Sequence, residues 1–130
     1  MLTYKNNDPY IEGTSLYDLV KVCQTPFYVY SQEKIINQVN KTKKILGNNI
    51  FYSIKSNSNQ AILKLMNSLD IGADVVSVGE LKRALEAGFD PNKIIFEGVG
   101  KSEQDLLYAI YKNIRLINTE SVSYTHLTLP

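Results

Sequence analysis

The sequence predicts an α/β protein built from parallel βα units. From residue 50 to residue 118, short apolar and β-branched runs alternate with segments of helical periodicity, and the pattern repeats about every twenty residues. Turn-forming residues such as Gly88 and the pair Asp90-Pro91 separate these segments. Four units of this kind would make half of an eight-stranded (β/α)8 TIM barrel, because a complete one takes about 250 residues.

A flavodoxin-like sheet has a similar rhythm and is the alternative architecture. Such a sheet would be expected to carry a glycine-rich phosphate turn after its first strand. This chain has Lys-Ser-Asn-Ser-Asn at that place, from residue 55 to residue 59. The half-barrel is therefore favoured.

The first part of the chain predicts two helices and one strand. Residues 15–22 carry helical periodicity, and residues 27–30 form an aromatic and β-branched run typical of a strand. Ser31 is a good N-cap for a longer helix that Gly47 would end. Lys34 stands where a capping box has an acidic residue, so the capping box is incomplete.

The remaining elements follow the alternating pattern. In chain order they are a strand over 50–54, a helix over 60–69, a strand over 73–76, a helix over 78–87, a strand over 93–96, a helix capped by Ser102 and reaching about residue 112, and a strand over 115–118. We expect an apolar inner face of the sheet that includes Ile50, Phe51 or Tyr52, Val75 and Ile95.

Bulk properties exclude several classes of function. The 130 residues carry a net charge of +1, which gives no electrostatic basis for a nucleic-acid or anionic-membrane partner. A single cysteine, Cys23, excludes an intrachain disulfide and suits a reducing compartment. No apolar run reaches membrane-spanning length, and the first residues do not resemble a signal peptide. We expect a cytoplasmic protein without a metal site.

Lys55 is the candidate catalytic residue. It lies at the carboxyl end of the buried run 50–54, where its ammonium needs water, a counter-ion or a covalent partner. A partly desolvated lysine loses its proton more readily, and the free amine can attack a carbonyl carbon. Spacing alone favours a lysine whose ammonium simply reaches solvent from the end of a strand.

Other polar residues follow the later strands. Asp74 with Ser77, then Gly98, and then residues 118–120 all come at or just after a predicted strand end. Barrel enzymes carry their chemistry at the carboxyl ends of the strands, so these residues are expected near Lys55.

Three stretches resemble, in order, the motifs of one enzyme family. They are residues 51–57 (FYSIKSN), 72–81 (GADVVSVGEL) and 87–102 (AGFDPNKIIFEGVGKS). They are similar to the pyridoxal-phosphate enzymes with an alanine-racemase-like barrel, in particular to their decarboxylase branch. The resemblance runs from about residue 25 to residue 121, and Ser53 and Ser56 replace alanines that are common in the family.

The resemblance implies roles for particular residues. Lys55 would hold pyridoxal 5'-phosphate as an internal aldimine, and Asp74 would lie near it and stabilise a cationic lysine. Asp74 could instead be a helix cap or a turn acid. Glu80 matches a family glutamate but favours a helix-capping role. Lys101 could contact a phosphate, although a solvated loop lysine is the favoured interpretation.

The resemblance also implies an activity and partners. Among family members, the chain is most similar to those that decarboxylate meso-2,6-diaminopimelate to L-lysine. Alternatives are an ornithine, arginine or carboxynorspermidine type of decarboxylase, or a non-catalytic pyridoxal-phosphate carrier. The implied partners are an amino-acid substrate and a second copy of the chain in a homodimer, with neither nucleic acid nor membrane.

The expected domain organisation has three parts. Residues 1–30 would be a leading segment associated with a second, β-rich domain, and residues 31–121 the first half of the cofactor-binding barrel. Residues 122–130 depart from the family pattern and resemble the in-frame translation of a sequencing adaptor. We therefore expect an N-terminal fragment, inactive by itself, that lacks the phosphate-binding loops and the C-terminal domain.

Overall fold

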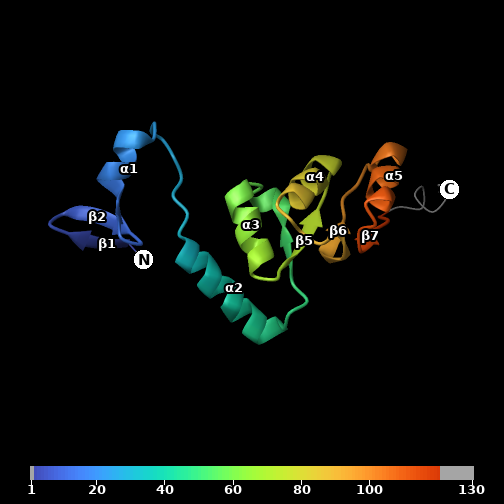
Figure 1. Cartoon of the computed structure of the whole chain (residues 1–130), viewed down its shortest axis with the longest axis horizontal. Coiled ribbons are helices and arrows are strands. Elements are labelled where there is room, and N and C mark those ends of the chain that lie inside the picture. Colours follow the sequence, from blue (N-terminus) through green and yellow to red (C-terminus); the bar gives the residue numbers. More distant parts are fainter. Residues whose placement is uncertain (1, 121–130) are drawn as a thin grey trace. The chain divides into compact units, whose positions relative to one another are not determined.

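The computed structural model describes residues 2–120 (Figure 1). These residues form two compact units that divide between Ile45 and Leu46, and each unit is described by itself. Within residues 2–120, no helix is both long and apolar enough to cross a membrane.

The first unit begins with an antiparallel sheet that the sequence patterns did not indicate. Its strands are β1 (Leu2–Lys5), β2 (Asp8–Ile11) and β3 (Thr14–Ser15). Asn6 and Asn7 connect β1 to β2 with φ angles of 50° and 63°. Asparagine tolerates this left-handed region, which a tight hairpin turn requires.

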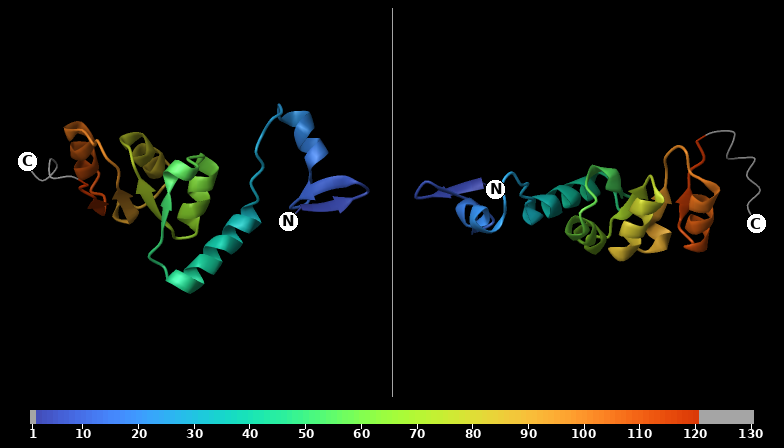
Figure 2. Two further views of the ribbon diagram at one scale, coloured as in Figure 1. Left: turned by 180° about the vertical axis from the view of Figure 1, so that it is seen from behind. Right: turned by 90° about the horizontal axis from the view of Figure 1, so that it is seen from above.

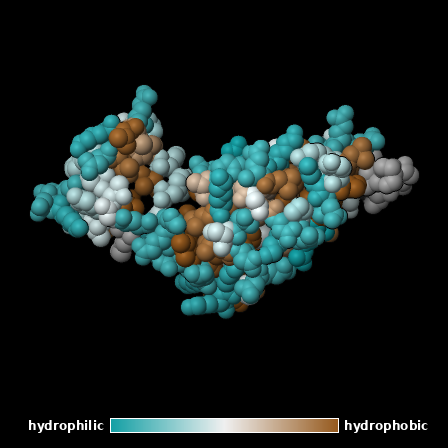
Figure 3. All heavy atoms as spheres, viewed as in Figure 1, coloured by the Kyte–Doolittle hydropathy of each residue, from teal (hydrophilic) through white to brown (hydrophobic). Residues whose placement is uncertain are grey.

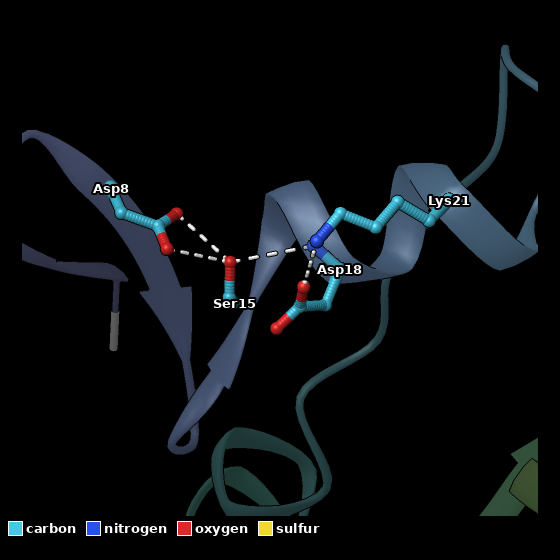
Figure 4. A network of polar contacts seen from close by, with 4 residues as sticks. All are labelled: Asp8, Ser15, Asp18 and Lys21. Atoms are coloured by element: carbon cyan, nitrogen blue, oxygen red, sulfur yellow. Dashed lines mark hydrogen bonds and ion pairs between the residues drawn. The ribbon is translucent and has the colours of Figure 1, made fainter.

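A polar network joins this sheet to helix α1 (Leu16–Val22) (Figure 4). The buried Ser15 donates to the Asp8 carboxylate at 2.7 Å, and its hydroxyl oxygen accepts from the Asp18 N–H at 3.4 Å. Lys21 pairs with Asp18 at 2.7 Å. A side-chain hydrogen bond with Asp8 raises the pKa of Tyr10. Helix α1 therefore begins directly after Ser15, one residue later than predicted, because Ser15 caps the helix and is fixed from both sides.

The strand predicted over residues 27–30 is wrong. This segment has no regular secondary structure, and the Tyr28 side chain is 88% exposed. The predicted helix after it is confirmed as α2 (Gln32–Leu46), and Ser31 accepts from the Lys34 N–H at its start. The acid missing from the capping box comes from elsewhere in the chain, since Glu12 accepts a hydrogen bond from the Glu33 N–H at 2.9 Å.

The second unit is a four-stranded parallel sheet, which confirms the predicted α/β class. Its strands β4 (Phe51–Ser53), β5 (Gly72–Val75), β6 (Ile94–Phe96) and β7 (Leu116–Ile117) lie side by side in chain order. Helices α3 (Gln60–Ser68), α4 (Val78–Glu86) and α5 (Glu103–Tyr111) connect them and lie along one face of the sheet (Figure 2).

The core lies between this sheet and its helices. Ala73, Val75 and Ile94 are completely buried on the helix side, together with Leu63 of α3 and Leu81 of α4. The expectation that Val75 belongs to the inner face is therefore wrong. Side chains alternate across a strand, so Val75 and the residue paired with it in register face the helices. Asp74 and its register partners face the side of the sheet without helices.

The opposite face carries a mixed set of side chains. In register from β4 to β7 they are Ser53, Asp74, Ile95 and Leu116, and Leu116 is 51% exposed. Apolar residues also reach the surface elsewhere in the molecule (Figure 3). This helix-free face holds the polar residues that concern the candidate site.

Candidate active site

Lys55 lies just beyond strand β4, not within it. The strand ends at Ser53, and Ile54–Ser56 form a 3₁₀ turn, η1. Ile54 is completely buried and anchors this turn, whereas the Lys55 side chain is exposed. Within residues 2–120 the Lys55 ammonium has no hydrogen bond or ion pair, so the amine is accessible at the carboxyl edge of the sheet.

The segment after Lys55 is held by two side-chain hydrogen bonds, one local and one long-range. The Tyr52 hydroxyl donates to the Asn57 carbonyl at 3.0 Å, and Arg83 Nε donates to the Ser58 carbonyl at 3.0 Å. Asn59 then caps α3 through the Ala61 N–H at 2.9 Å. The polar run after the lysine is therefore a fixed turn.

Asp74 lies on β5, which pairs with β4, the strand that precedes Lys55. Residue 74 pairs in register with Ser53, and Ser53 Oγ donates to Asp74 Oδ2 at 2.9 Å. Asp74 Oδ1 is buried and has no hydrogen-bond partner among the described residues. An unpartnered buried carboxylate oxygen is unfavourable by itself, which indicates that this atom awaits a donor or a cation. Among residues 2–120 the carboxylate caps no helix, and Asp74 lies within strand β5 and not in a turn.

Glu80 has the structural role that its position favoured. Its carboxylate accepts from the Val76 N–H at 2.9 Å, while Ser77 Oγ accepts from the Glu80 N–H at 3.2 Å. This reciprocal arrangement satisfies amides around the start of α4 and fixes the turn that follows β5.

Lys101 differs from its sequence-based interpretation. It is only 7% exposed, so it is not a solvated loop lysine. Its ammonium donates to the Gly98 carbonyl and to the Asn118 carbonyl, the second at 2.8 Å. At the start of α5, Ser102 and Asp105 form a complete capping box, so the helix supplies its own anion.

Two residues of the site escaped sequence reasoning. Ser53 orients Asp74, and Arg83 holds the turn after Lys55 from a helix 28 positions away. Strand register could have indicated Ser53, but no sequence signal distinguishes Arg83 from a solvated helical arginine.

The arrangement suits carbonyl chemistry. An accessible primary amine on a rigid turn can form a covalent bond with an aldehyde, and a neighbouring strand supplies an oriented carboxylate. No group of three or more metal-ligating side chains occurs among residues 2–120.

Comparison with protein families gives an independent result. Residues 32–127 match the family model described as pyridoxal-dependent decarboxylase, pyridoxal binding domain. Diaminopimelate decarboxylase from Aquifex aeolicus is 39% identical over 121 residues, which is 92% of this chain and 29% of that protein.

Solved structures give the same result for the fold. The crystal structure of diaminopimelate decarboxylase from M. jannaschii in co-complex with L-lysine matches with a TM-score of 0.80 and 33% identity, over 95% of this chain and 30% of the other. Arginine decarboxylase from Paramecium bursaria Chlorella virus matches with a TM-score of 0.68 and 26% identity, over 82% of this chain and 30% of the other. The chain thus spans about 30% of the length of the relatives it matches.

Proposed function

Because this chain belongs to the pyridoxal-dependent decarboxylase family through its pyridoxal-binding domain, we propose that the complete protein decarboxylates meso-2,6-diaminopimelate to L-lysine. The proposed substrate rests on one observation: the chain is more similar to diaminopimelate decarboxylases than to an arginine decarboxylase. The relatives named diaminopimelate decarboxylase that were compared are 33–45% identical, whereas the arginine decarboxylase structure is 26% identical.

The residues of the carboxyl edge fit the family's cofactor, pyridoxal 5'-phosphate. Lys55 offers an exposed amine that makes no hydrogen bond or ion pair with another residue of the described range 2–120. Asp74 offers a buried carboxylate oxygen that has no hydrogen-bond partner among residues 2–120, on a carboxylate held in orientation by Ser53. These two features are what a carbonyl cofactor with a cationic nitrogen beside it would need.

When bound, the cofactor supplies an electron sink for the electron pair left by the departing carboxylate. Lys55 Nζ would hold the cofactor covalently, and as a free amine it would be the group placed to hold or donate a proton at the substrate carbon. Asp74 stabilises positive charge on the lysine nitrogen, and Ser53 keeps its carboxylate in one orientation. The bonds from Tyr52 and Arg83 keep the turn that carries Lys55 in place.

Covalent trapping tests the role of Lys55. Borohydride reduction of the complete protein with pyridoxal phosphate, followed by peptide mapping, should place the pyridoxyl group on Lys55. Lys55→Ala should abolish turnover, because the cofactor can no longer be held and released covalently. Lys64, an exposed lysine of α3, is the control, and Lys64→Ala should keep both label and activity. A label on another lysine would contradict the proposal.

Substrate competition tests the reaction. Carbon dioxide release should show a higher kcat/KM for meso-diaminopimelate than for ornithine or arginine, since discrimination lies in that ratio. A preference for ornithine or arginine would assign the protein to the neighbouring activity. Binding of pyridoxal phosphate without any decarboxylation would assign it to the non-catalytic carriers.

The remaining expectations concern the complete protein and are part of the same proposal. Residues 1–30 would join a second, β-rich domain, and residues 31–121 would be the first half of the barrel. The complete protein would work as a cytoplasmic homodimer. Residues 122–130, which lie outside the described residues, would be absent from a read of the source locus made without adaptors.

A further inference from the structure

Lys101 is the least exposed charged residue among residues 2–120. It lies in the loop between β6 and α5 and is only 7% exposed, and no other charged residue among those described is buried. A buried ammonium needs hydrogen bonds or a counter-charge, so its position requires a reason. The proposed reaction gives it no chemical role.

The ammonium joins two separate loops. It donates to the Gly98 carbonyl, in the loop after β6, and to the Asn118 carbonyl at 2.8 Å, directly after β7. The ammonium also lies 5.4 Å from the centroid of the Phe96 ring, at the end of β6. An ammonium suits this position because it has three donors and these carbonyls are acceptors.

Gly98 extends this connection to two further residues. Its N–H donates to Glu120 Oε1 at 2.6 Å, which adds a second bond between the loops after β6 and β7. Its φ is +97°, and a Cβ there would lie 3.1 Å from the Val76 carbonyl oxygen, the residue that follows β5. Lys101 and Gly98 therefore link the carboxyl ends of β6 and β7 by hydrogen bonds, and the Gly98 backbone packs closely against Val76, directly after β5.

Those contacts argue against an anion-binding role for Lys101. Two of its three donors bind backbone carbonyls, and the adjacent start of α5 is already capped by Asp105. An incoming phosphate would compete with these carbonyls and would meet a carboxylate. The same contacts favour a role in geometry.

We propose that Lys101 is a positioning residue of the decarboxylase, a buried cation that fixes the loops after β5, β6 and β7 relative to one another. Asp74 lies in β5, two residues before Val76, which Gly98 contacts. Fixing these loops therefore also restricts the position of the Asp74 carboxylate on the helix-free face of the sheet. The inference rests on the proposed function for its effect on turnover, but not for its effect on loop order.

Kinetics of the complete protein test the effect on turnover. Lys101→Met keeps the length of the side chain and removes the donors, and it should lower kcat about 100-fold, the loss typical of a misplaced site. Lys101→Arg, which keeps charge and donors, should recover most of that loss. The matched control is Lys82→Met, at an exposed lysine of α4 whose ammonium lies 5.5 Å from the Tyr108 ring centroid. A Lys101→Met variant that loses only thermal stability and turns over like the control would overturn the proposal.

Amide hydrogen exchange of the cofactor-free protein tests loop order without any activity. Lys101→Met should raise the exchange rates of Gly98 and of residues 116–120 by about tenfold or more, while strand β4 stays unchanged. If Lys101→Met does not fold, Glu120→Ala removes only the second bond and should raise the Gly98 rate to a smaller extent. Unchanged rates would refute the link between the loops. Failure of wild-type protein to bind pyridoxal phosphate would refute the proposed function instead.

Discussion

Gly72→Ala is a sharp test of how β4 and β5 pack against each other. A Cβ at residue 72 would lie 2.4 Å and 2.6 Å from two ring carbons of Phe51, and 2.8 Å from the Lys93 carbonyl oxygen. Ordinary contact begins at 3.4 Å, so the ring would have to retreat by about 1 Å. The ring also lies 5.6 Å from the Arg115 guanidinium carbon, a contact that such a movement would disturb.

The expected destabilisation follows from two opposing terms. Inserting a methyl group into a filled site costs about 1–3 kcal/mol, and here one obstacle is a backbone carbonyl, which cannot rotate away. Replacing glycine restricts the unfolded chain and offsets about 0.4–1 kcal/mol, because residue 72 has no positive φ. The two terms leave a net loss for Gly72→Ala of roughly 0–2.6 kcal/mol, and the backbone obstacle places the expected value in the upper part of this range.

Urea denaturation of the complete protein measures this loss as a lower midpoint. Gly79→Ala is the matched control, since the nearest atom to its new methyl group is 3.7 Å away and the residue lies within α4. This control should gain about 0.5–1 kcal/mol. Adding Phe51→Leu to Gly72→Ala should recover part of the loss. A Gly72→Ala variant as stable as wild type would refute the close packing of Phe51 on β5.

Three further predictions concern the rest of the chain. The Ser31 hydroxyl and then the Glu33 N–H lower the pKa of Glu12 from 4.5, so their stabilisation is complete above that value and is lost as pH falls through the lowered pKa. An NMR titration of the Glu12 carboxyl should show this, and Glu12→Gln should remove it. Arg83→Met removes the bond to Ser58 and should lower kcat about threefold to tenfold, with Arg83→Lys less affected; equal kcat for the variant and wild type would contradict it. The 130-residue chain by itself should aggregate, stay molten or dimerise through its sheet edges, and should not release carbon dioxide, because its sheet has unpaired edges and one helix-free face; gel filtration and near-ultraviolet circular dichroism test this, and a monodisperse, well-folded and active monomer would contradict it.

Local patterns predicted the second unit well. Helices α3, α4 and α5 begin at residues that the sequence marks by cap chemistry, such as Ser102 with Asp105. Strand limits were less accurate, because the run 50–54 is mostly apolar and aromatic but the chain already turns at Ile54. Strand propensity depends on residue type, so it cannot distinguish an apolar residue in a strand from one, such as Ile54, that is buried in the following turn.

The first unit was predicted less well, for a reason visible in its residues. Tyr28 and its neighbours have strand propensity but no strand partner among the described residues, and propensity alone does not create pairing. The hairpin was missed because Pro9 lies in β2, although Asn6-Asn7 is a turn signal.

The candidate site was predictable only where chemistry is local. Lys55 followed from its position after an apolar run and from the resemblance of its motif. The contact between Ser53 and Asp74 depends on the register of two strands 21 residues apart. The burial of Lys101 depends on the path of a later loop, which no local pattern specifies.

The strict chain order of β4, β5, β6 and β7 has a consequence for synthesis of the protein. Each new strand pairs with the one made just before it, so no strand has to wait for a distant partner. Ribosomes add about 5–20 residues per second, so a unit of some twenty residues emerges over one to several seconds, whereas helices form within about a microsecond. The sheet can therefore grow by one strand and one covering helix at a time while translation continues, and Leu63 and Leu81 can be shielded from water before β7 has been made.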